Sequence, residues 1–174
     1  MFFIELETQR LLLKNIGYED AEFMYKEFST DEVNTYLFDA EPISSLEEAM
    51  ELIDFYVQDE PRDQHRWILI LKELNEKIGT CGFHSWNRRF GSVEIGYDLQ
   101  PDLWRKGYMS EALSEIISFA KNEMKVKSIT ANIAQDNAAS MGIAAKLGFH
   151  RTENTYFEDF RGRKYLHYIY QLDL

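Results

Sequence analysis

Residues 103–112 read LWRKGYMSEA, and this stretch decides how the fold is interpreted. It joins a strand-like segment to a helix and carries two adjacent cations, Arg105 and Lys106, followed by Gly107. The first N–H groups of a helix lack partners within the helix, and the helix dipole makes that end positive. Such a helix start can bind a pyrophosphate. Taken alone, the stretch fits equally well an ordinary helix start with a solvated Arg105 and Lys106.

Two better-known nucleotide-binding patterns are absent from this stretch. The three glycines of a dinucleotide-binding fingerprint are missing, and Gly107 is not followed by the Lys-Ser or Lys-Thr pair of a Walker A motif. A second cluster follows later in the chain, consisting of Asn137-Ala138-Ala139-Ser140 and Lys146-Leu147-Gly148-Phe149. The two clusters together are more informative than either alone.

Composition predicts one globular domain over residues 1–174, since 45% of the residues are hydrophobic and 14% aromatic. No apolar run approaches the roughly 18 residues of a membrane span, and the N-terminus lacks the features of a signal peptide. A lone cysteine, Cys81, excludes an internal disulfide and gives no metal-ligand spacing. We therefore expect a cytoplasmic protein without a metal ion and without a membrane partner.

The formal net charge of −11 bears on the partners of the chain. Nucleic-acid binding normally depends on a basic patch, so the charge argues against a nucleic-acid partner, tRNA included. Electrostatic steering would favour cationic partners such as amines or basic peptide termini. Solubility alone explains the charge equally well.

Hydrophobic periodicity predicts a mixed α/β (α+β) domain with about six or seven strands and about four helices. The stretch from Val93 to Ile133 alternates strand, helix and strand, which is typical of a crossover between two parallel strands. Residues 30–42 are expected to be irregular. The predicted strands cover residues 7–16, 67–71, 77–83, 93–99, 127–133, 149–158 and 164–172, and the helices cover 18–28, 44–56, 107–122 and 137–147.

The chain resembles the GNAT superfamily of N-acetyltransferases, in particular its branch of ribosomal-protein alanine and serine N-acetyltransferases. The resemblance covers essentially the whole chain in element order. It implies a GNAT fold, a mixed sheet whose two parallel strands splay apart, and acetyl-CoA as the co-substrate. It is carried by Glu94-Ile95-Gly96-Tyr97, residues 101–112, Asn137-x-x-Ser140, Lys146-Leu147-Gly148-Phe149 and Thr8-Gln9-Arg10-Leu11-Leu12-Leu13.

The resemblance implies three coenzyme-binding segments, a strand, a phosphate loop and a helix start. Arg105 and Met109 stand where the superfamily usually has small residues, so we expect them to crowd the approach, although Arg105 could add a phosphate contact. Tyr97 could also be a core aromatic residue, and Asn137 could be a helix N-cap. The implied residues are Tyr97, Asp98 and Leu99 for pantetheine, Trp104, Arg105, Lys106, Gly107, Tyr108, Met109 and Ser110 for the phosphates, and Asn137.

Three residues are candidates for catalysis. The resemblance implies that Ser140 is the general acid for the leaving thiolate; the alternative is a serine that only bonds the helix backbone. At pH 7, neutralising a lysine-type amine costs about 4.6 kcal/mol and an α-amine about 1 kcal/mol, so a base helps the first kind most. Glu94 is the leading candidate, acting directly or through water, and His84 is the second. A solvated Glu94 and a structural His84 are the corresponding alternatives.

The acceptor site is expected in the acidic and aromatic segment 30–42, with Asp31 and Glu32 as carboxylates and Trp86 and residues 157–160 closing it. The leading hypothesis is direct transfer to a peptide or protein N-terminal α-amine or to a small amine within a ternary complex. A non-catalytic acyl-CoA-binding sensor or regulatory module is the alternative. The sequence leaves open the acceptor and the choice between monomer and homodimer.

Overall fold

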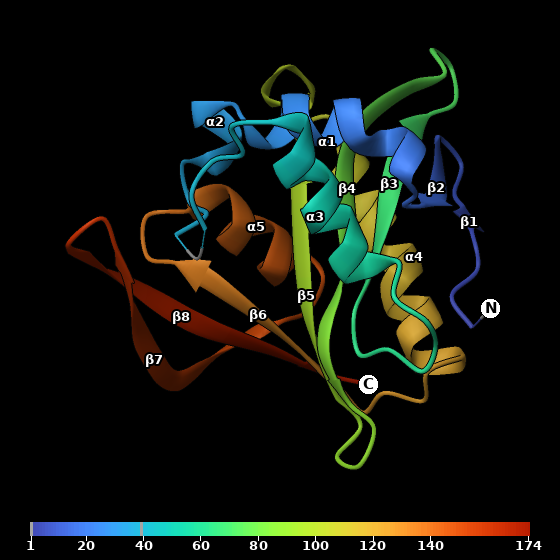
Figure 1. Cartoon of the computed structure of the whole chain (residues 1–174). Coiled ribbons are helices and arrows are strands. Elements are labelled where there is room, and N and C mark those ends of the chain that lie inside the picture. The colour runs from blue at the N-terminus through green and yellow to red at the C-terminus, as the bar shows by residue number, and fades with distance from the viewer. Residues whose placement is uncertain (1, 39) are drawn as a thin grey trace.

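Residues 2–38 and 40–174, which the computed structural model describes, form an eight-stranded mixed sheet in the order β1-β2-β3-β4-β5-β6-β8-β7 (Figure 1). Every neighbouring pair is antiparallel except β5 and β6. The strands are β1 (Leu6–Glu7), β2 (Leu11–Asn15), β3 (His65–Leu71), β4 (Glu76–Asn87), β5 (Ser92–Leu99), β6 (Ser128–Ala134), β7 (His150–Phe160) and β8 (Arg163–Asp173).

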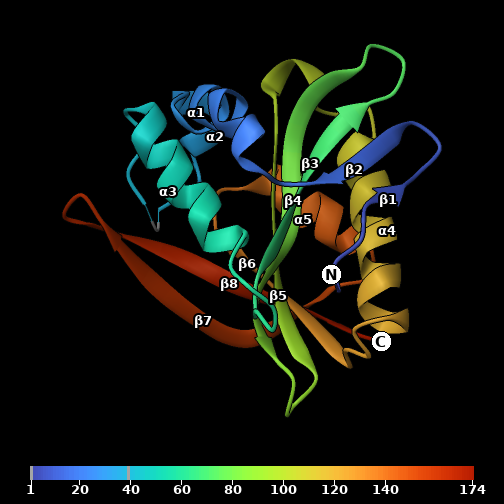
Figure 2. The same ribbon diagram turned by 45° about the vertical axis from the view of Figure 1, so that its right-hand side comes forward.

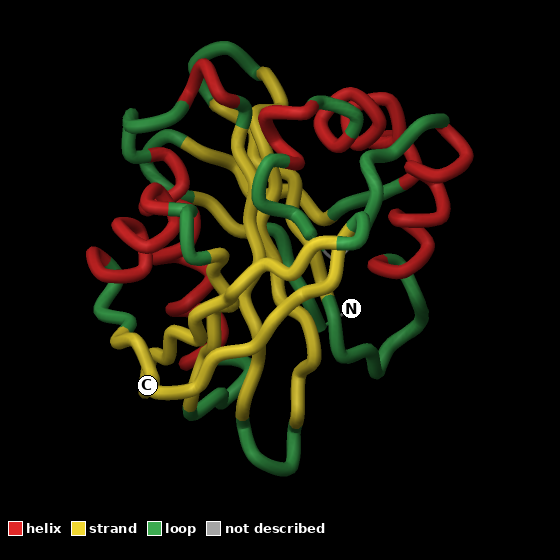
Figure 3. Tube along the Cα trace, turned by 90° about the vertical axis from the view of Figure 1, so that its left-hand side faces the viewer, coloured by secondary structure: helices red, strands yellow, loops and turns green. Residues whose placement is uncertain are grey.

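The described part of the chain also contains five α-helices, which lie on both faces of the sheet (Figures 2 and 3). One face carries α1 (Ala21–Phe28), α2 (Asp31–Asn34) and α3 (Leu46–Tyr56), and α1 and α3 form a core with Ile68. The other carries α4 (Tyr108–Asn122) and α5 (Ala138–Lys146) over a larger core. Along β5, Val93 and Ile95 belong to that larger core, so alternation places Glu94, Gly96 and Asp98 on the α1–α3 face.

The parallel strands β5 and β6 pair only over a short stretch. Their register runs from Ser92 opposite Ser128 to Glu94 opposite Thr130. Beyond Glu94 the two strands diverge, and α5 lies behind the opening (Figure 1). The expected splayed parallel pair is confirmed.

The sheet has one strand more than expected, and there is one additional helix. Residues 7–16 do not form one strand, because the turn from Thr8 to Leu11 divides them into β1 and β2. Residues 30–42 are not wholly irregular, since they contain the single turn of α2. Among the described residues no helix is long and apolar enough to cross a membrane.

Candidate active site

The open edge of β5 begins where its pairing with β6 ends. Gln100, directly after β5, donates its backbone N–H to the Ile78 carbonyl of β4. Because backbone groups alternate in direction along a strand, the even-numbered residues of β5 direct theirs toward β4 as well. The backbone groups of Ile95, Tyr97 and Leu99 therefore face the gap. The indole of Trp104 already bonds the Leu99 carbonyl at 2.7 Å. What remains is a short row of peptide groups that can pair with an extended amide-containing ligand.

Asp98 does not belong to that row. Its backbone is directed toward β4, and its buried carboxylate accepts hydrogen bonds from Arg66 at 2.8 Å and from the backbone N–H of Thr80 at 3.1 Å. This geometry gives no support to the implied role of Asp98 in holding pantetheine, which stays a prediction. The single-residue alternation of a strand turns Asp98 away from the gap that Tyr97 and Leu99 face.

The loop before α4 presents unpaired backbone donors. Gly107 is the N-cap of α4 with φ of 83°, and the first hydrogen bond within the helix runs from Glu111 N–H to the Gly107 carbonyl at 3.1 Å. No side chain caps this helix start, so the N–H groups of Tyr108, Met109 and Ser110 point out of its end. With the exposed Arg105 and Lys106 beside them, these groups have the arrangement that an anion-binding helix start requires.

The two unusual residues of the loop behave differently. Arg105 adopts a left-handed backbone conformation with φ of 62°, which costs a non-glycine residue about 1 kcal/mol, so the loop keeps the shape that a glycine would adopt more easily. Met109 packs into the core and is 4% exposed. The expectation that Met109 crowds the approach is wrong, because its side chain points inward from the first turn of the helix.

Asn137 and Ser140 begin the second cluster. Asn137 is the N-cap of α5, and its side-chain oxygen accepts the backbone N–H of Ser140 at 3.0 Å. The Ser140 side chain hydrogen-bonds Tyr97, which partly offsets the rise in the pKa of Tyr97 that burial causes. The structure thus places the start of α5 against β5, on the face that carries α4.

Glu94 and His84 lie on the opposite face of the sheet. Glu94 accepts a hydrogen bond from the Asn132 side chain at 2.9 Å, across the point where β5 and β6 part. His84 is its partner in the β4–β5 register. Burial and the charge of Arg66 lower the pKa of His84 to about 4. Asn132 was not recognised from the sequence, although alternation along residues 128–134 places it on this face.

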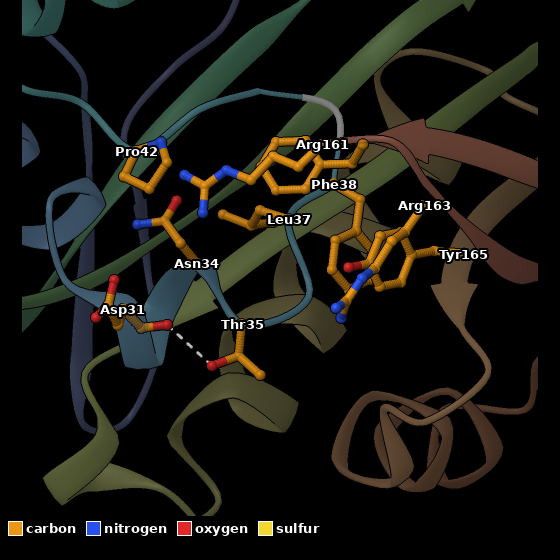
Figure 4. Close-up of a pocket in the computed structure, with 10 residues that line it drawn as sticks. Asp31, Asn34, Thr35, Leu37, Phe38, Pro42, Arg161, Arg163 and Tyr165 are labelled. Atoms are coloured by element: carbon orange, nitrogen blue, oxygen red, sulfur yellow. Dashed lines mark hydrogen bonds between the residues drawn. The ribbon is translucent and has the colours of Figure 1, made fainter.

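A cavity of about 460 Å³ lies between α2, the segment that follows it and the β7–β8 hairpin (Figure 4). Its aromatic wall includes Phe38 stacked on Tyr165, with ring centroids 3.7 Å apart. Arg161 bridges the two sides by bonding Glu41 at 2.8 Å. The lining residues are Asp31, Asn34, Thr35, Leu37, Phe38, Pro42, Phe160, Arg161, Arg163 and Tyr165.

Only part of the expected acceptor site gathers here. Asp31 and Phe160 line the cavity, whereas Glu32 does not. Trp86 was wrongly assigned to this site, because it stacks on Phe2, with centroids 5.4 Å apart, and packs against the larger core. The register shift between His84 and Asn87 and the positive φ of Ser85 turn Trp86 to that face.

The site also includes a buried polar network that was not predicted from the sequence. Arg66 donates to Thr80 Oγ1 at 2.6 Å, to the Tyr56 hydroxyl at 2.8 Å and to Asp98 at 2.8 Å. Glu27 on α1 adds a second buried carboxylate, and burial and the charge of Asp98 raise the pKa of Glu27 to about 8. A charged residue directly before the apolar run of residues 67–71 was the available signal for a buried partner.

The described residues contain no group of three or more histidine, cysteine, aspartate or glutamate side chains arranged to hold a metal ion. They do contain the open backbone edge of β5 and the start of α4 on one side of the sheet. The carboxylates of Glu94 and Asp98 and the neutral imidazole of His84 lie on the other.

Comparison with known proteins identifies relatives over most of the chain. The family model of the acetyltransferase (GNAT) domain matches residues 10–150. The uncharacterized N-acetyltransferase YoaA of Bacillus subtilis is 35% identical over 147 residues, which cover 84% of this chain and 82% of YoaA. The uncharacterized N-acetyltransferase p20 of Bacillus licheniformis is 32% identical over the same shares of the two chains.

Solved structures show the same fold at low sequence identity. A complex of RimL, a ribosomal L7/L12 α-N-protein acetyltransferase, with coenzyme A superimposes with a TM-score of 0.89 at 16% identity, covering 98% of both chains. The spermidine N-acetyltransferase of Vibrio cholerae, in complex with CoA and spermine, gives a TM-score of 0.82 at 19% identity and covers 94% of this chain and 95% of its own.

Proposed function

The chain belongs to the GNAT acetyltransferase family and is an N-acetyltransferase, and from this premise we propose that it transfers the acetyl group of acetyl-CoA to a primary amine by direct attack in a ternary complex. The acceptor class comprises peptide or protein N-terminal α-amines and small amines. The observation that carries the proposal is the gap between β5 and β6, which joins a coenzyme-binding edge on one face to ionisable side chains on the other.

The coenzyme side of the proposal depends on backbone groups. Ile95, Tyr97 and the N–H of Leu99 offer hydrogen bonds to the pantetheine amides along the open edge of β5. The helix start at residues 107–110 lies just beyond that edge and offers its N–H groups to the diphosphate. Trp104, Arg105, Lys106 and Asn137 complete the proposed coenzyme site.

Glu94 is the proposed base, acting directly or through water. It lies at the last position where β5 pairs with β6, so an amine that enters the gap from the α1–α3 face meets its carboxylate. His84 is a weaker candidate, because a pKa of about 4 makes it a poor proton acceptor at neutral pH. Asn132 holds the Glu94 carboxylate in place.

Ser140 is the proposed acid for the leaving thiolate. It lies at the start of α5, on the face where the coenzyme is proposed to bind, and its hydroxyl bonds that of Tyr97. A raised pKa keeps the Tyr97 phenol protonated at neutral pH, so the phenol can replace a proton that Ser140 gives up. An acyl-cysteine route is disfavoured, because Cys81 is fully buried and burial raises the pKa of its thiol.

The cavity at α2 and the β7–β8 hairpin is the proposed acceptor entrance. The distance from Asn132, the partner of Glu94, to Tyr165 at the cavity can be estimated along the strands. Ala134 lies two residues after Asn132 on β6 and pairs with His167, and Tyr165 lies two residues further along β8. Asn132 and Tyr165 are therefore about 14 Å apart. An acceptor that fills the cavity and reaches Glu94 must therefore be extended, as a peptide N-terminus or a polyamine is. RimL acts on a protein α-amine and the Vibrio enzyme on spermidine, which supports both possibilities.

Calorimetry with CoA, followed by thiol release with a panel of N-terminal peptides and small amines, tests the proposal. We expect CoA to bind and at least one amine to raise thiol release above the rate of acetyl-CoA hydrolysis. Binding of CoA without stimulation by any amine would favour the sensor or regulatory module. A failure of CoA to bind would refute the proposal altogether.

A further inference from the structure

We propose that Arg10 is a positioning residue for the coenzyme diphosphate, holding the loop 104–107 in its binding shape and offsetting a carboxylate in the first turn of α4. The inference rests on the proposed coenzyme site and adds a residue from the β1–β2 turn, almost a hundred positions away in the sequence. It follows from one continuous set of contacts that joins this turn to the helix start.

Glu111 is the anchor of these contacts. Its carboxylate accepts hydrogen bonds from the Thr8 hydroxyl at 2.6 Å, the Arg10 backbone N–H at 2.8 Å and the Arg10 Nε at 2.7 Å. Although burial raises it, the hydrogen bonds from Thr8 and Arg10 hold the pKa of Glu111 below its usual value. The turn between β1 and β2 is therefore fastened to the first turn of α4.

The far end of the Arg10 guanidinium contacts the loop itself. Its Nη1 donates to the Lys106 carbonyl at 3.0 Å, between two left-handed residues, Arg105 and Gly107. Its Nη2 would lie 3.4 Å from a Cβ atom placed on Gly107, and its plane covers the Tyr108 ring at 4.4 Å. The contact with the Lys106 carbonyl offsets part of the cost of holding Arg105 in the left-handed region.

Electrostatics gives Arg10 a second role. A carboxylate at Glu111 lies in the turn of α4 whose N–H groups would meet the diphosphate, and it would repel that anion. Arg10 pairs with Glu111 and adds a cation beside the N-cap. A lysine could supply the charge, but it lacks the planar fork that bonds Glu111 and the Lys106 carbonyl together.

The test compares four proteins: the wild type, Arg10→Gln, Arg10→Lys and a control, Lys72→Gln. Their dissociation constants are measured for CoA by calorimetry and for pantetheine by NMR titration. Lys72 is the matched control, because it also joins the β1–β2 hairpin, bonding Glu7 and the Thr8 carbonyl, but does not touch the loop. Pantetheine lacks the diphosphate, so its affinity separates a local effect from a general loss of the site. Thermal melting checks that each variant is folded.

We expect Arg10→Gln to raise the dissociation constant for CoA about 10- to 30-fold, which is the lower part of the range for hydrogen bonds that involve charged groups. Arg10→Lys should fall between this variant and the wild type, and Lys72→Gln should bind CoA like the wild type. Pantetheine should bind all four proteins equally.

Two results would overturn the inference while leaving the proposed function intact. One is folded Arg10→Gln with wild-type affinity for CoA, and the other is an equal loss of affinity for CoA and pantetheine. If Arg10→Gln does not fold, Arg10→Lys decides between the same outcomes. Wild-type protein that does not bind CoA would instead remove the proposed function, and the inference with it.

Discussion

Glu27 should make the stability of this protein fall as the pH rises, and replacing it by glutamine should remove that dependence. Glu27 is 2% exposed, and burial and the charge of Asp98 raise its pKa from 4.5 to about 8. Between these two pH values the unfolded chain has lost the proton that the folded chain keeps. Folding therefore takes up a proton there, and the free energy of unfolding decreases with increasing pH.

The magnitude follows from the difference in proton binding. Each pH unit within this window changes the free energy of unfolding by about 1.4 kcal/mol per proton, so the step from pH 5.5 to 7.5 costs about 2 to 3 kcal/mol. Glu27→Gln is neutral at both pH values and should lose this contribution. Glu22→Gln is the control, since Glu22 is exposed on the same helix and the substitution is the same.

Urea denaturation of the three proteins at pH 5.5 and 7.5 provides the measurement, with unchanged m-values as the check on two-state unfolding. Relative to the wild type, Glu27→Gln should gain about 2 to 3 kcal/mol of stability between the two pH values, and the stability of Glu22→Gln should change with pH as that of the wild type does. A change of less than about 0.5 kcal/mol in the stability difference between Glu27→Gln and the wild type, which is the scatter of ordinary surface substitutions, would contradict a raised pKa of Glu27.

Four further predictions concern the reaction. Ser140→Ala should lower turnover about 100-fold while CoA affinity in calorimetry stays unchanged, and unchanged single-turnover thiol release would remove Ser140 from the mechanism. Glu94→Gln should slow lysine-type amines more than α-amines, and equal slowing of both would argue against a base at this position. Cys81→Ala should leave turnover at the wild-type level, and the native thiol should resist a disulfide reagent until the chain unfolds. Trp104→Phe should weaken CoA binding about 3- to 10-fold, because the loop before α4 loses the hydrogen bond that ties it to the Leu99 carbonyl, whereas an unchanged affinity would show that the indole bond is dispensable.

The elements that could be predicted from the sequence are those with a local signal. Alternation identified β5, and helical spacing with the glycine at position 107 identified α4 and its start. The division of residues 7–16 had no such signal, because the turn is held by Glu111, far away in the chain. Local patterns cannot report a contact whose two partners are a hundred residues apart.

The same limit explains why the contacts of Asp98 and Trp86 could not be predicted from the sequence. Asp98 lies on a correctly predicted strand, but its partner Arg66 comes from β3, so only the fold reveals that its carboxylate is already committed. Trp86 follows a correctly predicted strand, but the bulge after His84 decides its face. Glu94 and Ser140 could be proposed from the sequence because each is adjacent to a motif whose spacing is local, and their catalytic roles stay predictions.

The geometry of β5 explains why the proposed reaction needs two separate proton carriers. Side chains of odd-numbered residues on this strand face α4 and α5, where Tyr97 meets Ser140, and those of even-numbered residues face α1–α3, where Glu94 meets Asn132. An amine arriving from one face and a thiolate leaving toward the other are therefore separated by the sheet itself. No single side chain can reach both, so the proton that Glu94 receives is not the one that Ser140 donates. The gap beyond Glu94 is the opening through which the two reactants can touch.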